Sequence, residues 1–273
     1  MSPVDIVIAV IAGFAIGFSM GSVGGGGAIL AVPVLVYALG QPPLQATTGS
    51  LIVVGATGLL GTLLAHRRAR LDIGQGLVFG AVAVVGSSIG AIGAHWVAPE
   101  VLMASFAVLM LVVAVTTVRR LRRTPKEAAA AREARPVWAA GQVDWPQVGK
   151  VVALGTVVGL LTGFLGVGGG FLIVPALTLV LGVPMWRAGG TSLMVITISC
   201  AAALLTRLVS APAGVQPQWT TIGVLAVLAV VGLLVGDGLA AKANNRQLSI
   251  GFAVLVCAVA IYTAVQALPA LLG

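Results

Sequence analysis

Long apolar stretches, separated by short polar ones, run the length of this 273-residue chain. Ten segments can be distinguished, at 4–22, 28–39, 46–65, 74–96, 100–118, 150–166, 170–182, 190–209, 219–240 and 247–268. Most are long enough to cross a hydrocarbon core of ~30 Å. Their apolar residues do not alternate with polar ones, as the strands of a membrane barrel would require. The pattern predicts an all-α polytopic membrane protein.

The last five segments repeat the first five. AILAVPVLVYALGQPP resembles GFLIVPALTLVLGVPM, which aligns Ala28 with Gly170, and FAVLMLVVAV resembles FAVLVCAVAI, which aligns Phe106 with Phe252. Similarity that extends over both halves indicates two copies of one structural unit. We therefore expect an N-terminal membrane repeat at 1–118, a basic linker at 119–149 and a C-terminal membrane repeat at 150–273.

Composition supports a membrane protein, since 59% of the residues are hydrophobic and only 8% are charged. Soluble domains have ~25% charged residues. The net charge of +8 could suggest nucleic acid as a partner, but the positive residues cluster in short loops between apolar segments. Seven of the fifteen lie between Arg119 and Arg135. That distribution is typical of cytoplasmic loops, so no nucleic-acid partner is expected.

The basic residues also predict how the segments are oriented. If the linker is cytoplasmic and each segment changes sides, every basic residue except Arg207 falls on the cytoplasmic side. This predicts a multi-pass protein of the cytoplasmic membrane, with both termini on the outer side. Five segments per half is an odd number, so the two halves should be inverted relative to each other, as in many secondary transporters.

Two glycine-rich breaks, one in each half, carry the candidate chemistry. Gly24–Gly27 precedes the short run 28–39, and Gly166–Gly170 precedes the corresponding run. Glycine costs ~1 kcal/mol relative to alanine inside a helix, and the run 28–39 reaches only ~18 Å. Pro33 and Pro175 interrupt these runs further. We expect half-helices or re-entrant hairpins whose free N–H groups bind an anion near the membrane centre. Glycines that only permit close helix crossing are the alternative.

Hydroxyl residues follow each break. Thr47, Thr48 and Ser50 open the third segment of the first half, and Thr191 and Ser192 open that of the second. They either contribute to the anion site or cap the helix start, and both roles are compatible. The substrate-binding candidates are therefore Gly24, Gly25, Gly26, Gly27, Pro33, Thr47, Thr48, Ser50, Gly166, Gly168, Gly169, Gly170, Pro175, Arg187, Thr191 and Ser192.

Two charged residues have open interpretations. Arg187 either attracts an anion at the cytoplasmic mouth or anchors its segment there. Asp237 is the only acid clearly near a membrane span, which makes it a candidate for proton coupling. It lies shortly before Lys242, so an interfacial position is the alternative.

No enzyme, cofactor or metal site is expected. The string Gly86-Ser-Ser-Ile-Gly90 matches G-x-S-x-G, but it lies in a predicted membrane helix rather than at a strand-to-helix turn. No metal-binding spacing is present, and Cys200 and Cys257 both fall inside apolar segments.

The stretches GSVGGGGAILAVPVL and GFLGVGGGFLIVPAL resemble the sulfite exporter TauE/SafE family, over both halves and nearly the whole chain. The resemblance implies a permease for sulfite, sulfoacetate or related sulfur-containing or organic anions, with proton coupling. The first copy departs from the second in having a fourth consecutive glycine, and Ala28 stands where the second copy has Gly170. The positions that carry the motif are Gly24, Gly26, Gly27, Pro33, Gly166, Gly168, Gly169, Gly170 and Pro175.

Together these patterns predict a secondary transporter that moves small anions by alternating access. An anion channel without ion coupling is the alternative. The expected partners are a small anionic substrate and the lipid bilayer, and the sequence leaves the oligomeric state open.

Overall fold

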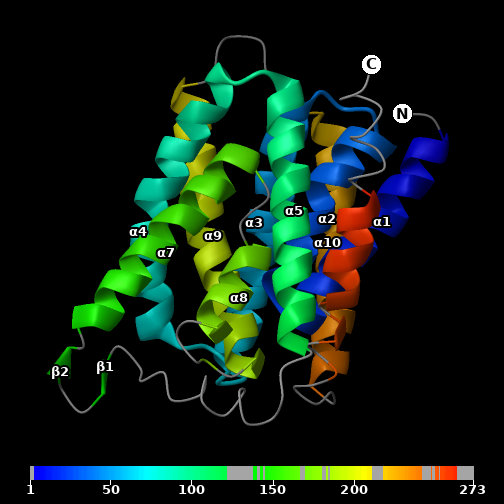
Figure 1. The fold of residues 1–273 in the computed structure, drawn as a ribbon. Coiled ribbons are helices and arrows are strands. Elements are labelled where there is room, and N and C mark those ends of the chain that lie inside the picture. The colour runs from blue at the N-terminus through cyan, green and yellow to red at the C-terminus, as the bar shows by residue number, and fades with distance from the viewer. Residues whose placement is uncertain are drawn as a thin grey trace.

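The computed structural model describes residues 3–121, 138–139, 142–143, 145–166, 170–179, 183, 185–210, 218–241, 247, 250–251 and 253–262. These residues form a bundle of helices (Figure 1), with one antiparallel hairpin of two-residue strands, β1 (Trp138–Ala139) and β2 (Gln142–Val143). Five helices in this part of the chain are long and apolar enough to cross a membrane. The predicted all-α polytopic class is confirmed.

The helices follow the predicted apolar segments closely. In the first half they are α1 (Pro3–Val23), α2 (Ala28–Pro33), α3 (Pro43–Arg67), α4 (Ile73–Gly93) and α5 (Pro99–Leu121). In the second half they are α7 (Trp145–Leu165), α8 (Gly170–Leu179), α9 (Met185–Ser210) and α10 (Trp219–Ala240), followed by a helical stretch at Ala253–Tyr262.

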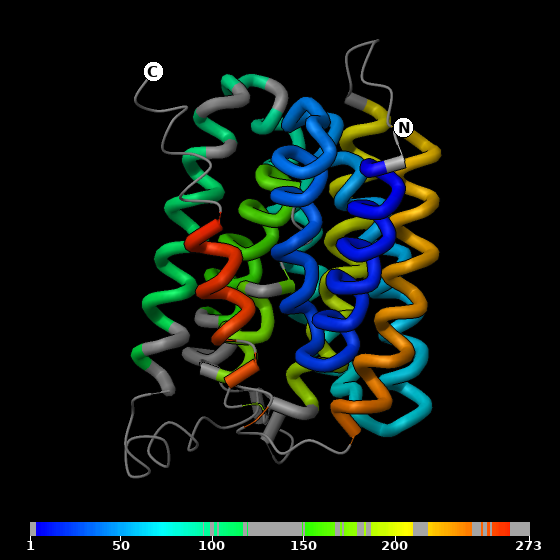
Figure 2. Tube along the Cα trace, turned by 90° about the vertical axis from the view of Figure 1, so that its right-hand side faces the viewer, coloured from blue at the N-terminus to red at the C-terminus, as the bar shows by residue number. Residues whose placement is uncertain are grey.

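The second helical segment of each half is short and irregular, as the glycines and prolines predict. A 3-10 turn at Gly25–Gly27 precedes α2, and a π-helix at Val34–Ala38 follows it. Pro33 ends α2 because it has no N–H to donate to the preceding turn. α8 has only ten residues and contains Pro175. Figure 2 shows α1 descending and the α2 segment returning toward the end of the bundle where α1 begins.

Helices of one half pair with helices of the other. α1 packs along α10, where Gly17 lies against Ala229, and α7 packs along α4, where Gly159 lies against Ala83. When the two sequence copies are aligned, Gly17 corresponds to Gly159 and Ala83 corresponds to Ala229, so the same contact occurs twice. The two halves are therefore interlocked rather than separate bodies.

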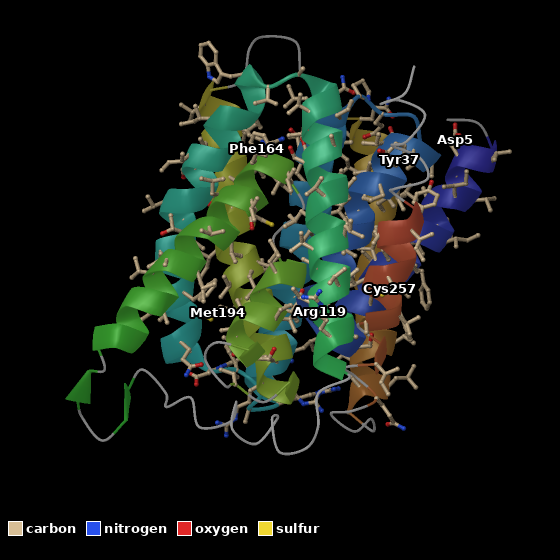
Figure 3. All side chains as sticks on the ribbon, viewed as in Figure 1. Asp5, Tyr37, Arg119, Phe164, Met194 and Cys257 are labelled. Carbon is tan, nitrogen blue, oxygen red and sulfur yellow. The ribbon has the colours of Figure 1, made fainter. Side chains whose placement is uncertain are left out.

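The outer surface of the bundle is apolar. Ile11, Leu63, Val108 and Val254 are each more than half exposed, and the sticks of Figure 3 show mainly carbon on the outward faces. A continuous apolar exterior of this extent is unfavourable in water and suits contact with lipid. The polar groups described below lie inside the bundle instead.

Candidate functional site

The two glycine breaks meet inside the bundle. A methyl group placed on Gly25 would lie 2.5 Å from the Cα atom of Gly170, and one placed on Gly170 would lie 2.5 Å from the carbonyl oxygen of Gly25. Side-chain carbons do not approach backbone atoms this closely, so the contact requires glycine on both sides. The structure therefore brings together the two breaks that the sequence pattern singled out.

Each break also lies against the N-terminal part of the third helix of the other half, α3 or α9. Gly24 has a left-handed φ of 82°, and a methyl group on it would lie 2.5 Å from Cα of Gly189 in α9. Gly166 has a φ of 64°, and a methyl group on it would lie 2.6 Å from the carbonyl oxygen of Thr47 in α3. Thr47 and Gly189 are aligned positions of the two copies, as are Gly24 and Gly166, so the two contacts are equivalent within the repeat.

Serine hydroxyls bridge these contacts. The Gly25 N–H donates to Oγ of Ser192 at 3.1 Å, and that hydroxyl donates to the Gly189 carbonyl at 2.7 Å. In the equivalent place the Ser50 hydroxyl donates to the Gly166 carbonyl at 2.5 Å. Both serines are fully buried. The predicted association of hydroxyl residues with the breaks is thus present in the structure.

The helix-capping interpretation of the hydroxyl residues is wrong. α3 begins at Pro43 and α9 at Met185, so the hydroxyl residues lie one to two turns inside the helices. Thr47 and Thr48 donate to the carbonyl of Leu44 within their own helix, at 3.0 and 2.9 Å. Because the helices extend further toward their N-termini than the apolar pattern indicated, the side chains reach the bundle interior instead of the helix ends.

A cavity of about 250 Å³ opens beside Gly24. A water molecule occupies ~30 Å³ in the liquid, so the cavity has room for a small oxyanion with several waters. Its lining includes Gly21, Gly24, Ala65, Gly189, Leu193 and Asp237. Small residues predominate in this lining, and its charged members are Arg70 and Asp237.

Asp237 forms ion pairs at this cavity. Its carboxylate oxygens lie 2.6 Å from Nη1 of Arg68 and 3.4 Å from Nη1 of Arg70. The Asp237 side chain is partly exposed, at 16%. These three residues link the end of α3 to the end of α10.

The sequence patterns did not identify Arg207 as a residue of the candidate site. They placed it on the outer side as an exception to the charge rule, whereas its side chain is buried, with 2% exposure, inside α9. Nη1 donates to Oγ1 of Thr47 at 2.7 Å and of Thr48 at 3.0 Å, and Nη2 donates to the Gly163 carbonyl at 3.0 Å. One signal was available: Arg207 aligns with Ala65 of the first copy, so a charge replaces an alanine between equivalent apolar segments.

The remaining predicted residues have more local positions. Gly26 and Gly27 are buried in the 3-10 turn, while Pro33 and Pro175 lie inside α2 and α8. Two further residues lie apart from the breaks. The Thr191 hydroxyl accepts a hydrogen bond from the Asp72 N–H at 3.1 Å, and Arg187 has an exposed side chain. Gly168 and Gly169 lie outside the described residues.

These features define a polytopic α-helical membrane protein with two interrupted helices that meet in its interior. The model of the sulfite exporter TauE/SafE family matches residues 9–263, and the chain belongs to this family. It is 28% identical over 265 residues to a "Probable membrane transporter protein" of Xylella fastidiosa strain 9a5c, with 94% of each chain covered. It is 27% identical over 253 residues to "Probable membrane transporter protein YunE" of Bacillus subtilis, with 89% of this chain and 90% of the relative covered. No solved structure matches the chain. The protein is thus a membrane transporter.

Proposed function

We propose that the protein is a secondary transporter of small anions, namely sulfite, sulfonates or related sulfur-containing or organic anions, and that it works by alternating access. The observation that carries this proposal is the meeting of the two glycine breaks next to a cavity of about 250 Å³. Interrupted backbone inside a membrane is tolerated where it lines a cavity or is buried in protein. Its N–H groups and the nearby hydroxyls are donors that suit an oxyanion.

The proposal includes an inverted relationship between the two halves. Two observations support it: the Gly24–Gly189 and Gly166–Thr47 contacts are reciprocal, and α1 descends in Figure 1 whereas α7 rises. Inverted halves allow each half to adopt the conformation of the other, which exposes a central site to the two sides in turn. The linker is cytoplasmic in this proposal, and both termini lie on the outer side of the cytoplasmic membrane.

Asp237 is the proposed coupling residue. In its ionised form it holds Arg68 and Arg70 beside the cavity. A proton on the carboxylate would remove the negative charge that attracts both guanidinium groups. The two arginine side chains could then move away from the mouth of the cavity. Proton binding and opening of the site would thereby be linked.

Flux into proteoliposomes tests the transport proposal. Purified protein is reconstituted and given sulfite, thiosulfate, a sulfonate and a carboxylate in turn. We expect saturable uptake of at least one sulfur oxyanion, and acceleration by the same anion trapped inside, because a carrier exchanges substrate across the membrane. Flux that neither saturates nor shows this exchange would instead indicate a channel. Absence of flux and of binding for the whole panel would contradict the anion proposal.

The Asp237→Asn variant tests the coupling residue. The amide cannot take up a proton, so we expect anion exchange to continue while uptake driven by a pH gradient is lost. Asp5→Asn, the same chemical change in the first turn of α1, serves as the control. Gradient-driven uptake by Asp237→Asn at the unmodified rate would exclude Asp237 as the coupling group.

A further inference from the structure

The two sides of the meeting point are equivalent in the backbone and different in their side chains. Four residues that line the cavity, Gly21, Ala65, Gly189 and Gly190, align in the other copy with Gly163, Arg207, Thr47 and Thr48 respectively. These four counterparts lie in contact with one another. The position equivalent to the open cavity is therefore occupied by the guanidinium group of Arg207.

The two positions lie at opposite ends of α3. The helix from Thr47 to Ala65 is about 27 Å long, at a rise of ~1.5 Å for each position. The cavity with Ala65 lies at the end of the bundle that carries Arg68 and Arg70. Arg207 lies in the last turn of α9. That end of α9 lies at the end of the bundle where α1 begins (Figure 2).

The described hydrogen-bond partners of Arg207 carry no negative charge. Among the described residues its acceptors are two threonine hydroxyls and one backbone carbonyl, all neutral. Its Nε–H is buried and has no hydrogen-bond partner in this part of the chain. A buried cation without a counter-charge is strongly unfavourable, and a buried N–H without an acceptor adds to that cost. An anion that binds here would give the guanidinium group a negative counter-charge and would give the Nε–H a hydrogen-bond acceptor.

We propose that Arg207, Thr47 and Thr48 form an oxyanion-binding site on the side of the bundle opposite the cavity. This inference rests on the proposed transport function and names the residue that recognises the charge of the substrate. In the state described, Arg207 fills the site with its own side chain and closes it. When that side opens, the guanidinium group releases its hydrogen bond to the Gly163 carbonyl and binds the anion instead. Its Nε–H and an Nη–H form the planar pair of donors that fits two oxygen atoms of one oxyanion.

The test measures transport from each side separately. Right-side-out and inverted membrane vesicles carrying Arg207→Gln or Arg207→Lys are assayed with the panel anion that the unmodified protein transports best. Arg207→Gln keeps a polar side chain of similar length but removes the charge. We expect its KM to rise about tenfold or more on the Arg207 side, and much less on the cavity side. Arg207→Lys should recover part of the loss because it restores the positive charge.

Two further measurements separate binding from a purely structural role. Arg119→Gln, which removes an exposed charge from α5, is the matched control and should leave KM unchanged on both sides. Competition by methanesulfonate and by neutral dimethyl sulfone measures charge selectivity, which Arg207→Gln should lower. If Arg207→Gln does not fold, Thr48→Val, which keeps the shape and removes one hydroxyl, carries the test and should raise KM on the Arg207 side severalfold.

The outcomes distinguish this inference from the proposed function. If the unmodified protein transports an anion while Arg207→Gln and Thr48→Val keep their KM on both sides, the site is wrong and the transport function stands. A lower melting temperature with unchanged KM and unchanged charge selectivity would show that Arg207 only joins α9 to α3 and α7. If the unmodified protein transports no anion, the proposed function itself fails.

Discussion

At Gly24 and Gly166 the backbone adopts φ values of 82° and 64°, directly against the backbone of the other half. A residue with a Cβ atom is disfavoured there twice, because the left-handed conformation costs roughly 1–2 kcal/mol and the neighbouring atoms leave no space. The two glycines therefore determine both where the helices break and how closely the halves approach. Gly24 lines the cavity, which connects this local geometry with the proposed anion site.

Gly24→Ala should lower stability by about 1–2 kcal/mol, from the left-handed strain alone, and should abolish anion flux because the break must move away from Gly189. Thermal unfolding in detergent and proteoliposome flux measure the two effects. Gly223→Ala is the control, since no atom lies within 4 Å of a methyl group at that position in α10. It should leave flux intact and stability unchanged or higher by up to ~1 kcal/mol. Equal behaviour of the two variants would argue against a special role for Gly24.

The candidate site was only partly predictable at this scale. The glycines and serines of the breaks are marked in the sequence because they are duplicated, and the structure places Gly25, Ser50, Gly166 and Ser192 in contact across the repeat. Arg207 was not identified, because hydropathy only shows that a charge lies near the end of an apolar segment. Its partners Thr47 and Thr48 belong to the other half of the chain, and only the packing of α9 on α3 brings them together.

At the scale of helices, small residues determine the pairing. α1 meets α10 through Gly17, Gly21, Gly232 and Gly236, and each of these glycines contacts the backbone of the opposite helix. Such surfaces allow close packing between helices in lipid, where the hydrophobic effect does not drive association. The sequence predicted the helices within a few residues because length and hydropathy mark them. It did not predict their partners, since a glycine-rich face fits any other small-residue face.

Gly17→Ala should force α1 and α10 apart, because the added methyl group overlaps the carbonyl of Ala229. Overpacking of this kind costs about 1–3 kcal/mol, so we expect a lower melting temperature in detergent. Gly159→Ala, which meets Ala83 in the equivalent interface, should lower it by a similar amount. Gly238→Ala has no atom within 4 Å of the new methyl group and provides the baseline. A melting temperature of Gly17→Ala at that baseline would contradict the close packing.

At the scale of the whole molecule, the interlocked halves make the transporter a single unit. The predicted division into a repeat at 1–118, a linker at 119–149 and a repeat at 150–273 stays a prediction about sequence copies, as does their inverted relationship. What the described residues show is that α1 lies on α10 and α4 on α7. A change in the angle between the halves would therefore act on all four helices together, as a rocking mechanism requires.

Reporter fusions test the proposed orientation. Alkaline phosphatase, which is active only outside the cytoplasm, should be active after Gly273 and inactive when inserted in the linker 119–149. Green fluorescent protein, which folds in the cytoplasm, should give the opposite pattern at the same two positions. The same result from both positions would mean an even number of crossings between them and would contradict inverted halves with five segments each.

The pairing of α1 with α10 also has a consequence for how the chain is made. α1 ends at Val23, and the helix that covers its glycine face begins at Trp219. A ribosome adding ~5–20 residues per second needs about 10–40 s to produce the intervening chain. During that time α1 is in the bilayer with its packing surface uncovered. Insertion of α1 and its assembly with α10 are therefore separate stages in the synthesis of this protein.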